Sequence, residues 1–301
     1  MILSNATDLR VPVLSAVVTG DSGYPDYVTE YQDIVVAKQS TAAIENSDSL
    51  VFYVYPTTTI SRNISGSKQL VKYGTGRLVL SGAKTYTGNT TIDAGTLELQ
   101  GTGLGSGTYN GTITNNGTLI LSPTTSQTLA GNISGSGSIH TLNNLTLSGN
   151  NTFTGDLSCS VKYLGNPVQL DLTNSNAAGN GNIIITGYSD YTRSSLNFSG
   201  FAGIPLKNNI ICKGPCSITS YGTEDSYLSG GLMFAQLGIG NSSPDITFSN
   251  AQTSGNFTIL SPISSVAPQT TSIRFYGGTV NLNSSNIFVN SGVIYIRGVN
   301  T

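Results

Sequence analysis

Residues 70–99, LVKYGTGRLVLSGAKTYTGNTTIDAGTLEL, decide the fold of this chain of 301 residues, because short strand-like runs alternate there with glycine-rich corners. In residues 78–80 (LVL) and 97–99 (LEL), the two leucines lie on one face of an extended segment. We expect that face to be buried and the opposite face to lie nearer solvent. The stretch therefore predicts half-buried β-strands and no helix.

Glycines mark the corners between these runs. Glycine adopts the positive φ of tight corners without a steric penalty, and from Gly76 onward the glycines of this stretch follow one another about six to seven residues apart. Corner glycines are expected in this stretch and in its later copies, at Gly74, Gly76, Gly82, Gly88, Gly95, Gly117, Gly149 and Gly155.

The pattern returns further along the chain. Gly82 corresponds to Gly149 and Gly88 to Gly155, each 67 residues later, and Tyr86 is replaced by an equivalent aromatic residue. Leu-x-Leu pairs that begin at residues 78, 97, 119 and 145 are 19, 22 and 26 residues apart. Such spacing, with no helical segment between the strands, is typical of a β-solenoid, in which each coil buries its apolar face against the next.

Short motifs in a fixed order identify a family resemblance. They are ISGS (64–67), KYGTG (72–76), LVLSG (78–82), YTG (86–88), TTI (90–92) and AGTL (94–97). This order resembles the autotransporter-associated β-strand repeat, also called the passenger-associated transport repeat, closely over residues 64–99 and more loosely over residues 111–157. The resemblance implies coils of a right-handed parallel β-helix in a surface-exposed or secreted passenger, or in another extracellular or virion-associated fibre. It implies no catalytic residues.

The fold class follows from the repeat. We predict an all-β protein, a right-handed parallel β-helix (β-solenoid) over residues 51–301, with a non-repetitive cap or attachment segment over residues 1–50. The first segment holds seven of the fifteen acidic residues and lacks the repeat, and a solenoid end requires a cap. Residues 190–245 are predicted to be a less regular, aromatic-rich part of the β-helix.

Composition excludes some partners. Charged residues make up only 9% of the chain, against about a quarter in ordinary soluble domains, so the surface must consist largely of hydroxyls and amides. The formal net charge of −2 offers no basic surface to nucleic acid. No apolar run approaches the roughly 20 residues that span a bilayer. We therefore expect no nucleic-acid partner and no membrane insertion.

The two ends of the sequence lack the signals of a complete autotransporter. The start, MILSNATDLR, has neither the basic region nor the apolar core of a secretory signal. The end, IYIRGVNT, continues the strand pattern and leaves no room for a membrane-barrel translocator. From these observations we expect that the export machinery is missing or has been cut away from a longer precursor.

Few residues suit catalysis. The single histidine, His140, lies in a strand-like run, where a solvent-facing histidine is the ordinary case. Glycan hydrolysis needs two carboxylates about 5 to 10 Å apart; Glu224 and Asp225 are adjacent, but neighbours in a strand point to opposite faces. Solvated loop acids are their more ordinary role. We expect no enzyme, no catalytic residue and no cofactor.

Three cysteines are too few for a structural zinc site with four ligands, so we expect no metal. Cys212 and Cys216 form either a local disulfide or two free thiols, and the redox compartment decides which. Because at least one cysteine stays unpaired, the count favours assembly in a reducing cytoplasm.

Aromatic residues gather in the less periodic middle of the chain. Surrounded by Asn, Ser and Thr, they suit contact with sugar rings, and they suit equally the core of an insertion. The candidates for contact with a glycan or receptor are Tyr188, Tyr191, Tyr221 and Tyr227, with Phe198, Phe201 and Phe234 nearby.

These observations predict a structural protein. The favoured prediction is a virion-associated fibre, spike or capsid-decorating protein that displays a rigid β-helix to a host-surface glycan or protein. It would be a homo-oligomer, with a trimer favoured, and would bind other virion proteins through residues 1–50. The alternatives are a passenger fragment of a bacterial autotransporter adhesin, at the cell surface or secreted, and a glycan-depolymerising spike.

Overall fold

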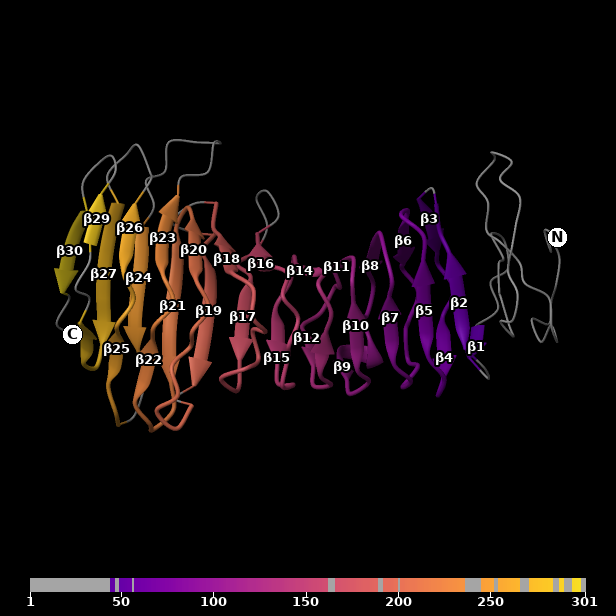
Figure 1. The fold of residues 1–301 in the computed structure, drawn as a ribbon, viewed down its shortest axis with the longest axis horizontal. Coiled ribbons are helices and arrows are strands. Elements are labelled where there is room, and N and C mark those ends of the chain that lie inside the picture. Colours follow the sequence, from indigo (N-terminus) through magenta and orange to yellow (C-terminus); the bar gives the residue numbers. More distant parts are fainter. Residues whose placement is uncertain are drawn as a thin grey trace.

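The computed structural model describes residues 44–46, 49–55, 57–161, 166–188, 192–199, 201–235, 245–251, 254–265, 271–283, 287–289 and 294–298. Within these residues the regular elements are β-strands and one 3-10 turn, η1 (Gly105–Gly107), and the paired strands are parallel. The coils stack into an elongated rod (Figure 1). The predicted all-β parallel β-helix is confirmed.

The strands stack into sheets that run along the rod. The eleven-stranded sheet contains β3 (Thr58–Ile60), β6 (Arg77–Leu80), β8 (Thr96–Leu99), β11 (Thr118–Leu121), β14 (Ser138–Thr141), β16 (Leu157–Ser160), β18 (Ile183–Thr186), β20 (Ile210–Lys213), β23 (Leu232–Ala235), β26 (Ile263–Ser265) and β29 (Ile287–Val289).

The nine-stranded sheet contains β9 (Thr108–Tyr109), β12 (Gln127–Leu129), β15 (Leu145–Leu147), β17 (Gln169–Leu172), β19 (Ser194–Ser199), β21 (Cys216–Tyr221), β24 (Asp245–Asn250), β27 (Thr271–Gly277) and β30 (Ile294–Gly298). The five-stranded sheet contains β2 (Leu50–Tyr53), β5 (Leu70–Tyr73), β7 (Thr90–Ile92), β10 (Ile113–Asn115) and β13 (Ile133–Ser134). Two smaller sheets contain β22 (Ser226–Leu228), β25 (Phe257–Ile259) and β28 (Val280–Leu282), and β1 (Ile44–Asn46) and β4 (Ile64–Gly66).

The core consists of ladders of apolar side chains that point into the coils. In the eleven-stranded sheet Leu78, Leu97, Leu119 and Ile139 stand in register on successive strands, and each is 0% exposed. Burial of such a side chain contributes about 1.5–3 kcal/mol. The predicted inward face of the Leu-x-Leu pairs is therefore correct, and the coils are held together by contacts between neighbours.

The corner glycines serve two purposes. Gly74 and Gly95 have φ of +82° and +67° and adopt the predicted left-handed conformation. Gly76, Gly82 and Gly88 are not among the residues with positive φ, so that part of the prediction is wrong for them. A Cβ at Gly82 or Gly88 would instead lie well under 3.0 Å from a backbone carbonyl oxygen of the preceding coil.

The later corner glycines follow the second pattern. A Cβ on Gly117, Gly149 or Gly155 would likewise lie under 3.0 Å from backbone atoms of the coil below, and none of the three has positive φ. Glycine is needed there because two coils approach too closely for a side chain.

Two segments were predicted to differ from the repeat, and the structure describes much more of the second than of the first. The predicted cap over residues 1–50 lies outside the described residues except for 44–46 and 49–50. In the aromatic-rich part, β19 to β23 continue the stack, and each pairs in parallel with a strand of a neighbouring coil.

Candidate functional site

The coil of residues 70–99 carries a lysine inside an apolar ladder. Lys72 stands in register between Phe52 and Ile92 in the five-stranded sheet, and its side chain is 0% exposed. Its Nζ donates hydrogen bonds to the carbonyl oxygens of Gly74 and Ala94, each at 2.7 Å. The ammonium group thus joins the corner of its own coil to the corner of the next.

A second buried lysine occupies the opposite side of the same coil. Lys84 bridges Ile64 and Leu104 in the preceding and following coils and is also 0% exposed. Its Nζ donates to the carbonyl oxygens of Leu80 at 3.0 Å, of Gly82 and of Gln100. Burial lowers the pKa of Lys72 and of Lys84 to about 8, with a nearby carboxylate partly opposing the shift of Lys72.

Tyrosine hydroxyls form a buried chain beneath the Gly88 corner. Thr90 Oγ1 lies 2.7 Å from the Tyr86 hydroxyl and 2.8 Å from the Tyr109 hydroxyl, which in turn donates to the Gly88 carbonyl oxygen. Burial raises the pKa of Tyr109 to about 12 and that of Tyr86 well above its ordinary value. The Tyr-x-Gly-x-Thr residues of the repeat are therefore internal braces and present no contact surface.

The predicted aromatic contact residues do not form one surface. Tyr221 is 44% exposed at the carboxyl end of β21, whereas Tyr188 precedes the neighbouring parallel strand β19, so the two lie toward opposite ends of adjacent strands. Tyr227 donates a hydrogen bond to Asp225 at 3.3 Å. Tyr191 lies outside the described residues.

The three phenylalanines considered with these tyrosines belong to the core. Phe198, Phe201 and Phe234 are at most 8% exposed. Phe198 packs edge-on against Phe257, with ring centroids 5.5 Å apart. The core interpretation of the aromatic-rich part therefore holds for its phenylalanines.

The predicted carboxylate pair braces loops. Glu224 Oε2 accepts a hydrogen bond from the backbone N–H of Ala202 at 2.7 Å, and Ala202 has a φ of +53°. Asp225 accepts hydrogen bonds from the backbone N–H of Asn256 at 2.7 Å and from Tyr227. These contacts support the loop role of the two acids, as expected from their sequence context.

The histidine lies on the outer side of the eleven-stranded sheet. His140 stands in register between Ile120 and Ser158, and its buried Nε2 has no hydrogen-bond partner. Burial lowers its pKa. Throughout the described ranges, no group of three or more His, Cys, Asp and Glu side chains is arranged to hold a metal ion.

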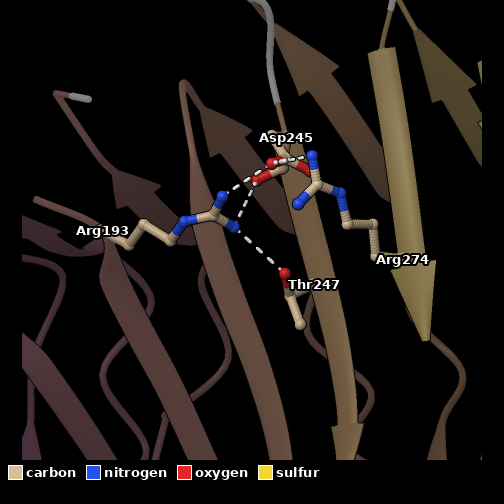
Figure 2. Close-up of polar contacts among 4 residues, drawn as sticks. All are labelled: Arg193, Asp245, Thr247 and Arg274. Carbon is tan, nitrogen blue, oxygen red and sulfur yellow. Dashed lines mark hydrogen bonds and ion pairs between the residues drawn. The ribbon is translucent and has the colours of Figure 1, made fainter. Parts of the chain in front are cut away.

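One charged cluster lies on the nine-stranded sheet and was not anticipated from the sequence. Asp245, which is 6% exposed, accepts hydrogen bonds from Arg193 Nη2 at 2.6 Å and pairs with Arg274 Nη2 at 3.1 Å (Figure 2). Arg193 Nη1 also donates to Thr247 Oγ1 at 3.1 Å. The partners are up to 54 residues apart in sequence, so local patterns carry no signal of this cluster.

The cluster ties several coils together. Arg193 directly precedes β19, Asp245 begins β24 and Arg274 lies in β27, so the ion pairs reach across β21. Two guanidinium groups share one carboxylate, and Asp245 Oδ1 is buried with no hydrogen-bond partner. The arrangement suits a clasp between coils, because its groups hold one another in place.

In the described part of the chain, no helix has the length and apolar character needed to cross a membrane. This finding agrees with the all-β architecture.

Comparison with known families identifies the repeat. The family model described as passenger-associated-transport-repeat matches residues 70–99 and 143–158. The first match contains the coil with both buried lysines, and the second lies within and just beyond the predicted second copy. Neither the curated proteins nor the solved structures gave a match. The chain is therefore a parallel β-solenoid that carries the passenger-associated transport repeat in these two segments.

Proposed function

We propose that this chain is the β-helical passenger region of an autotransporter-type protein, displayed on a bacterial surface or secreted. The observation that carries the proposal is the match to the passenger-associated transport repeat at residues 70–99 and 143–158. Both matched segments lie within one stack of parallel coils. This supports the proposal, because the repeat is then part of the rod and is not a separate domain.

The architecture suits a passenger physically. The backbone ladders join each coil to the coils before and after it, so coils can add one after another onto a folded end. The coil of residues 70–99 has its corner carbonyls satisfied by Lys72 and Lys84, which makes it a well-defined template for the next coil. We infer that the repeat coil supports the ordered stacking of the rod.

The family match favours the passenger over the virion-associated fibre, for which the comparisons provide no support. The contacts of Glu224 and Asp225 give a structural reason for both carboxylates and thus add nothing in favour of a glycan depolymerase. Trimer formation and binding to a glycan or protein of a host surface remain proposals about the displayed rod.

The location of the native polypeptide tests the proposal. Peptides from residues 44–298 are quantified by mass spectrometry in the outer membrane, culture medium, cytoplasm and cell-free particles of the source bacterium, before and after protease treatment of intact cells. We expect the peptides in the outer membrane or medium, with the membrane-bound pool lost upon protease treatment. A cytoplasmic marker protein that survives the treatment shows that the cells stayed intact.

Two outcomes would contradict this proposal. Peptides confined to the cytoplasm would argue against any display. Peptides that co-purify with virus particles, in a fixed ratio to the capsid protein, would return the virion-associated fibre as the better explanation.

A further inference from the structure

The three cysteines of the chain all lie in the core, on strands that meet where the eleven-stranded sheet turns into the nine-stranded sheet. Cys159, Cys212 and Cys216 are each 0% exposed and carry free thiols. Cys212 is in β20, and Cys216 begins β21 directly after a turn of two residues, Gly214 and Pro215. Two of the three thiols therefore flank the same corner of the same coil.

Only one pairing is compatible with this geometry. Cys212 and Cys216 lie on consecutive strands of one coil, on either side of the short turn between β20 and β21. Cys159 stands in register with Ile185, which stands in register with Cys212, so two strand spacings separate the two cysteines. Two spacings of a β-sheet are roughly 9.5 Å, which exceeds the limit of about 7 Å between the Cα atoms of a disulfide. Cys159 lies equally far from the coil of Cys216.

We propose that Cys212 and Cys216 form a disulfide in an oxidising compartment, and that Cys159 stays a free thiol. The oxidant is another disulfide, which reacts with the chain by thiol–disulfide exchange. The thiolate of one cysteine attacks a sulfur of the oxidant and forms a mixed disulfide, and the second cysteine then displaces the remaining thiol. One S–S bond forms in the chain, one is reduced in the oxidant, and the two hydrogens end on the two released thiols.

Burial determines when this exchange occurs. In the closed coil no solvent reaches either sulfur, and burial together with the hydrogen bond to Cys212 raises the pKa of Cys216 well above its ordinary value. Because the thiolate is the attacking species, the closed coil reacts slowly. The bond therefore forms while the coil is open, and subsequent coils then cover it.

The bond would secure a corner that already carries several constraints. Gly214 in the turn has a φ of +80°, and a Cβ on Gly187 would lie far under 3.0 Å from the Pro215 carbonyl oxygen. Cys216 stands in register with Ser194, which follows Arg193, and with Ile246, which follows Asp245. The disulfide would hold this turn in the conformation that supports the ion cluster above it.

A refolding experiment tests the pairing. The reduced full-length chain is unfolded in guanidinium chloride, refolded in a mixture of oxidised and reduced glutathione, and alkylated with iodoacetamide after denaturation. Trypsin cleaves after Lys213, between the two cysteines, so the bond joins two peptides that a reductant separates. We expect this joined pair, alkylation at Cys159 alone, and an intact chain lighter by two hydrogens than the reduced chain.

Matched variants sharpen the result. Cys159→Ser is expected to keep the joined peptides and lose the alkylated site, whereas Cys216→Ser is expected to lose the joined peptides and leave two alkylated cysteines. Three alkylated cysteines in the refolded wild type, or a bond that includes Cys159, would overturn the proposal. If the chain does not refold, it is exported to a bacterial periplasm behind an added signal peptide and trapped with iodoacetamide, and the same outcomes apply.

This inference rests on the proposed function only for its oxidising compartment. A bond that forms in glutathione, in a chain that is absent from both the bacterial surface and the medium, would leave the cysteine pair standing and refute the passenger proposal. A surface-displayed chain with three free thiols would support the passenger proposal and refute the disulfide.

Discussion

Hydrogen bonds to backbone carbonyl oxygens explain why the repeat tolerates a lysine side chain within an apolar ladder. A buried ammonium group is costly unless hydrogen bonds replace its lost water. Lys72 and Lys84 meet this condition with backbone carbonyls at the corners, where the chain turns and the ladder hydrogen bonds are interrupted. Each lysine therefore loses its hydration on folding and gains hydrogen bonds to several carbonyl oxygens at the corners.

The lowered pKa of these lysines predicts a pH dependence of stability. Between pH 8, near the folded pKa of Lys72 and Lys84, and pH 10.5, their ordinary value, the unfolded chain binds more protons than the folded chain. The free energy of unfolding therefore rises with pH in that window, by up to about 1.4 kcal/mol per pH unit for each lysine. Thermal unfolding between pH 7 and 9 is expected to shift to higher temperature as pH rises.

A lysine variant isolates this effect. Lys84→Met is expected to have a smaller rise in unfolding temperature over pH 7 to 9 than the wild type, whereas Lys207→Met, at an exposed position, is expected to keep the full rise. The buried thiols of Cys159 and Cys216 act in the opposite direction from about pH 8.5 and reduce the rise, and the buried tyrosines do so above pH 10, because their raised pKa keeps a proton that the unfolded chain releases. A rise of equal size in Lys84→Met and wild type would count against the lysine explanation.

Close approach between coils predicts the effect of a corner substitution. Gly82→Ala places a Cβ against the carbonyl oxygen of Arg62, where the backbone must shift. We expect a loss of about 1–3 kcal/mol in the free energy of unfolding, measured by chemical denaturation. Gly231→Ala is the control, because its Cβ would lie 3.2 Å from a side-chain oxygen of Asn209, which can move. Equal losses in both variants would refute the close-approach explanation.

Strands far apart in the sequence become neighbours at the level of elements, and the ion cluster is the clearest case. Asp245, at the start of β24, forms ion pairs with Arg193, which precedes β19, and with Arg274 in β27 (Figure 2). The arginine before β19 thereby reaches past β21, which the backbone ladder alone does not do. The cluster thus adds a link between coils that are not in direct contact.

Loss of the shared carboxylate is expected to be costly. Asp245→Asn keeps the shape of the side chain but removes the carboxylate charge that two guanidinium groups share, for an expected loss of about 3–5 kcal/mol in the free energy of unfolding. Added salt should reduce the loss, because it screens the repulsion between the partly exposed arginines. Chemical denaturation at low and high salt measures both effects.

A second substitution separates charge from packing. Adding Arg274→Gln to Asp245→Asn removes one of the two guanidinium charges that face residue 245 and is expected to restore part of the lost stability. No recovery in the double variant, or an unchanged free energy of unfolding in the single one, would show that the cluster does not act as a clasp.

The described part of the molecule is close to a one-dimensional stack, because the strands of each coil pair with those of the coils before and after it, and the Arg193–Asp245 ion pair adds a link across one coil. Figure 1 shows this arrangement along the rod, from β1 and β2 at one end to β30 at the other. Damage to one coil should therefore weaken its neighbours more than distant coils.

Hydrogen exchange measures how far such damage spreads. Leu119→Ala removes a fully buried side chain from the middle of the inner ladder, at an expected cost of about 2–5 kcal/mol. We expect faster amide exchange in β8, β11 and β14 and unchanged exchange in β26, with the exposed Ser126→Ala as the control. Uniformly faster exchange along the rod would instead indicate a single cooperative unit.

The sequence by itself determined the strands, the inward leucines and the period of the coil. These features are local, since alternation with period two and the glycine corners depend on residues close to one another in the chain. The assignment of Leu78 and Leu97 to a buried ladder was therefore possible without coordinates, and so was the family resemblance of residues 70–99.

Only the tertiary structure decided which polar residues are inside and which distant groups meet. The interior position of Lys72 and Lys84 depends on carbonyls of adjacent coils, and the pairing of Arg193 with Asp245 depends on the register between coils 52 residues apart. Only the tertiary structure explains why residue 82 must be glycine, since a Cβ there would meet the backbone of the coil beneath it. Loops of variable length separate the strands, so register between coils is a property of the packed stack and cannot be obtained from any local pattern.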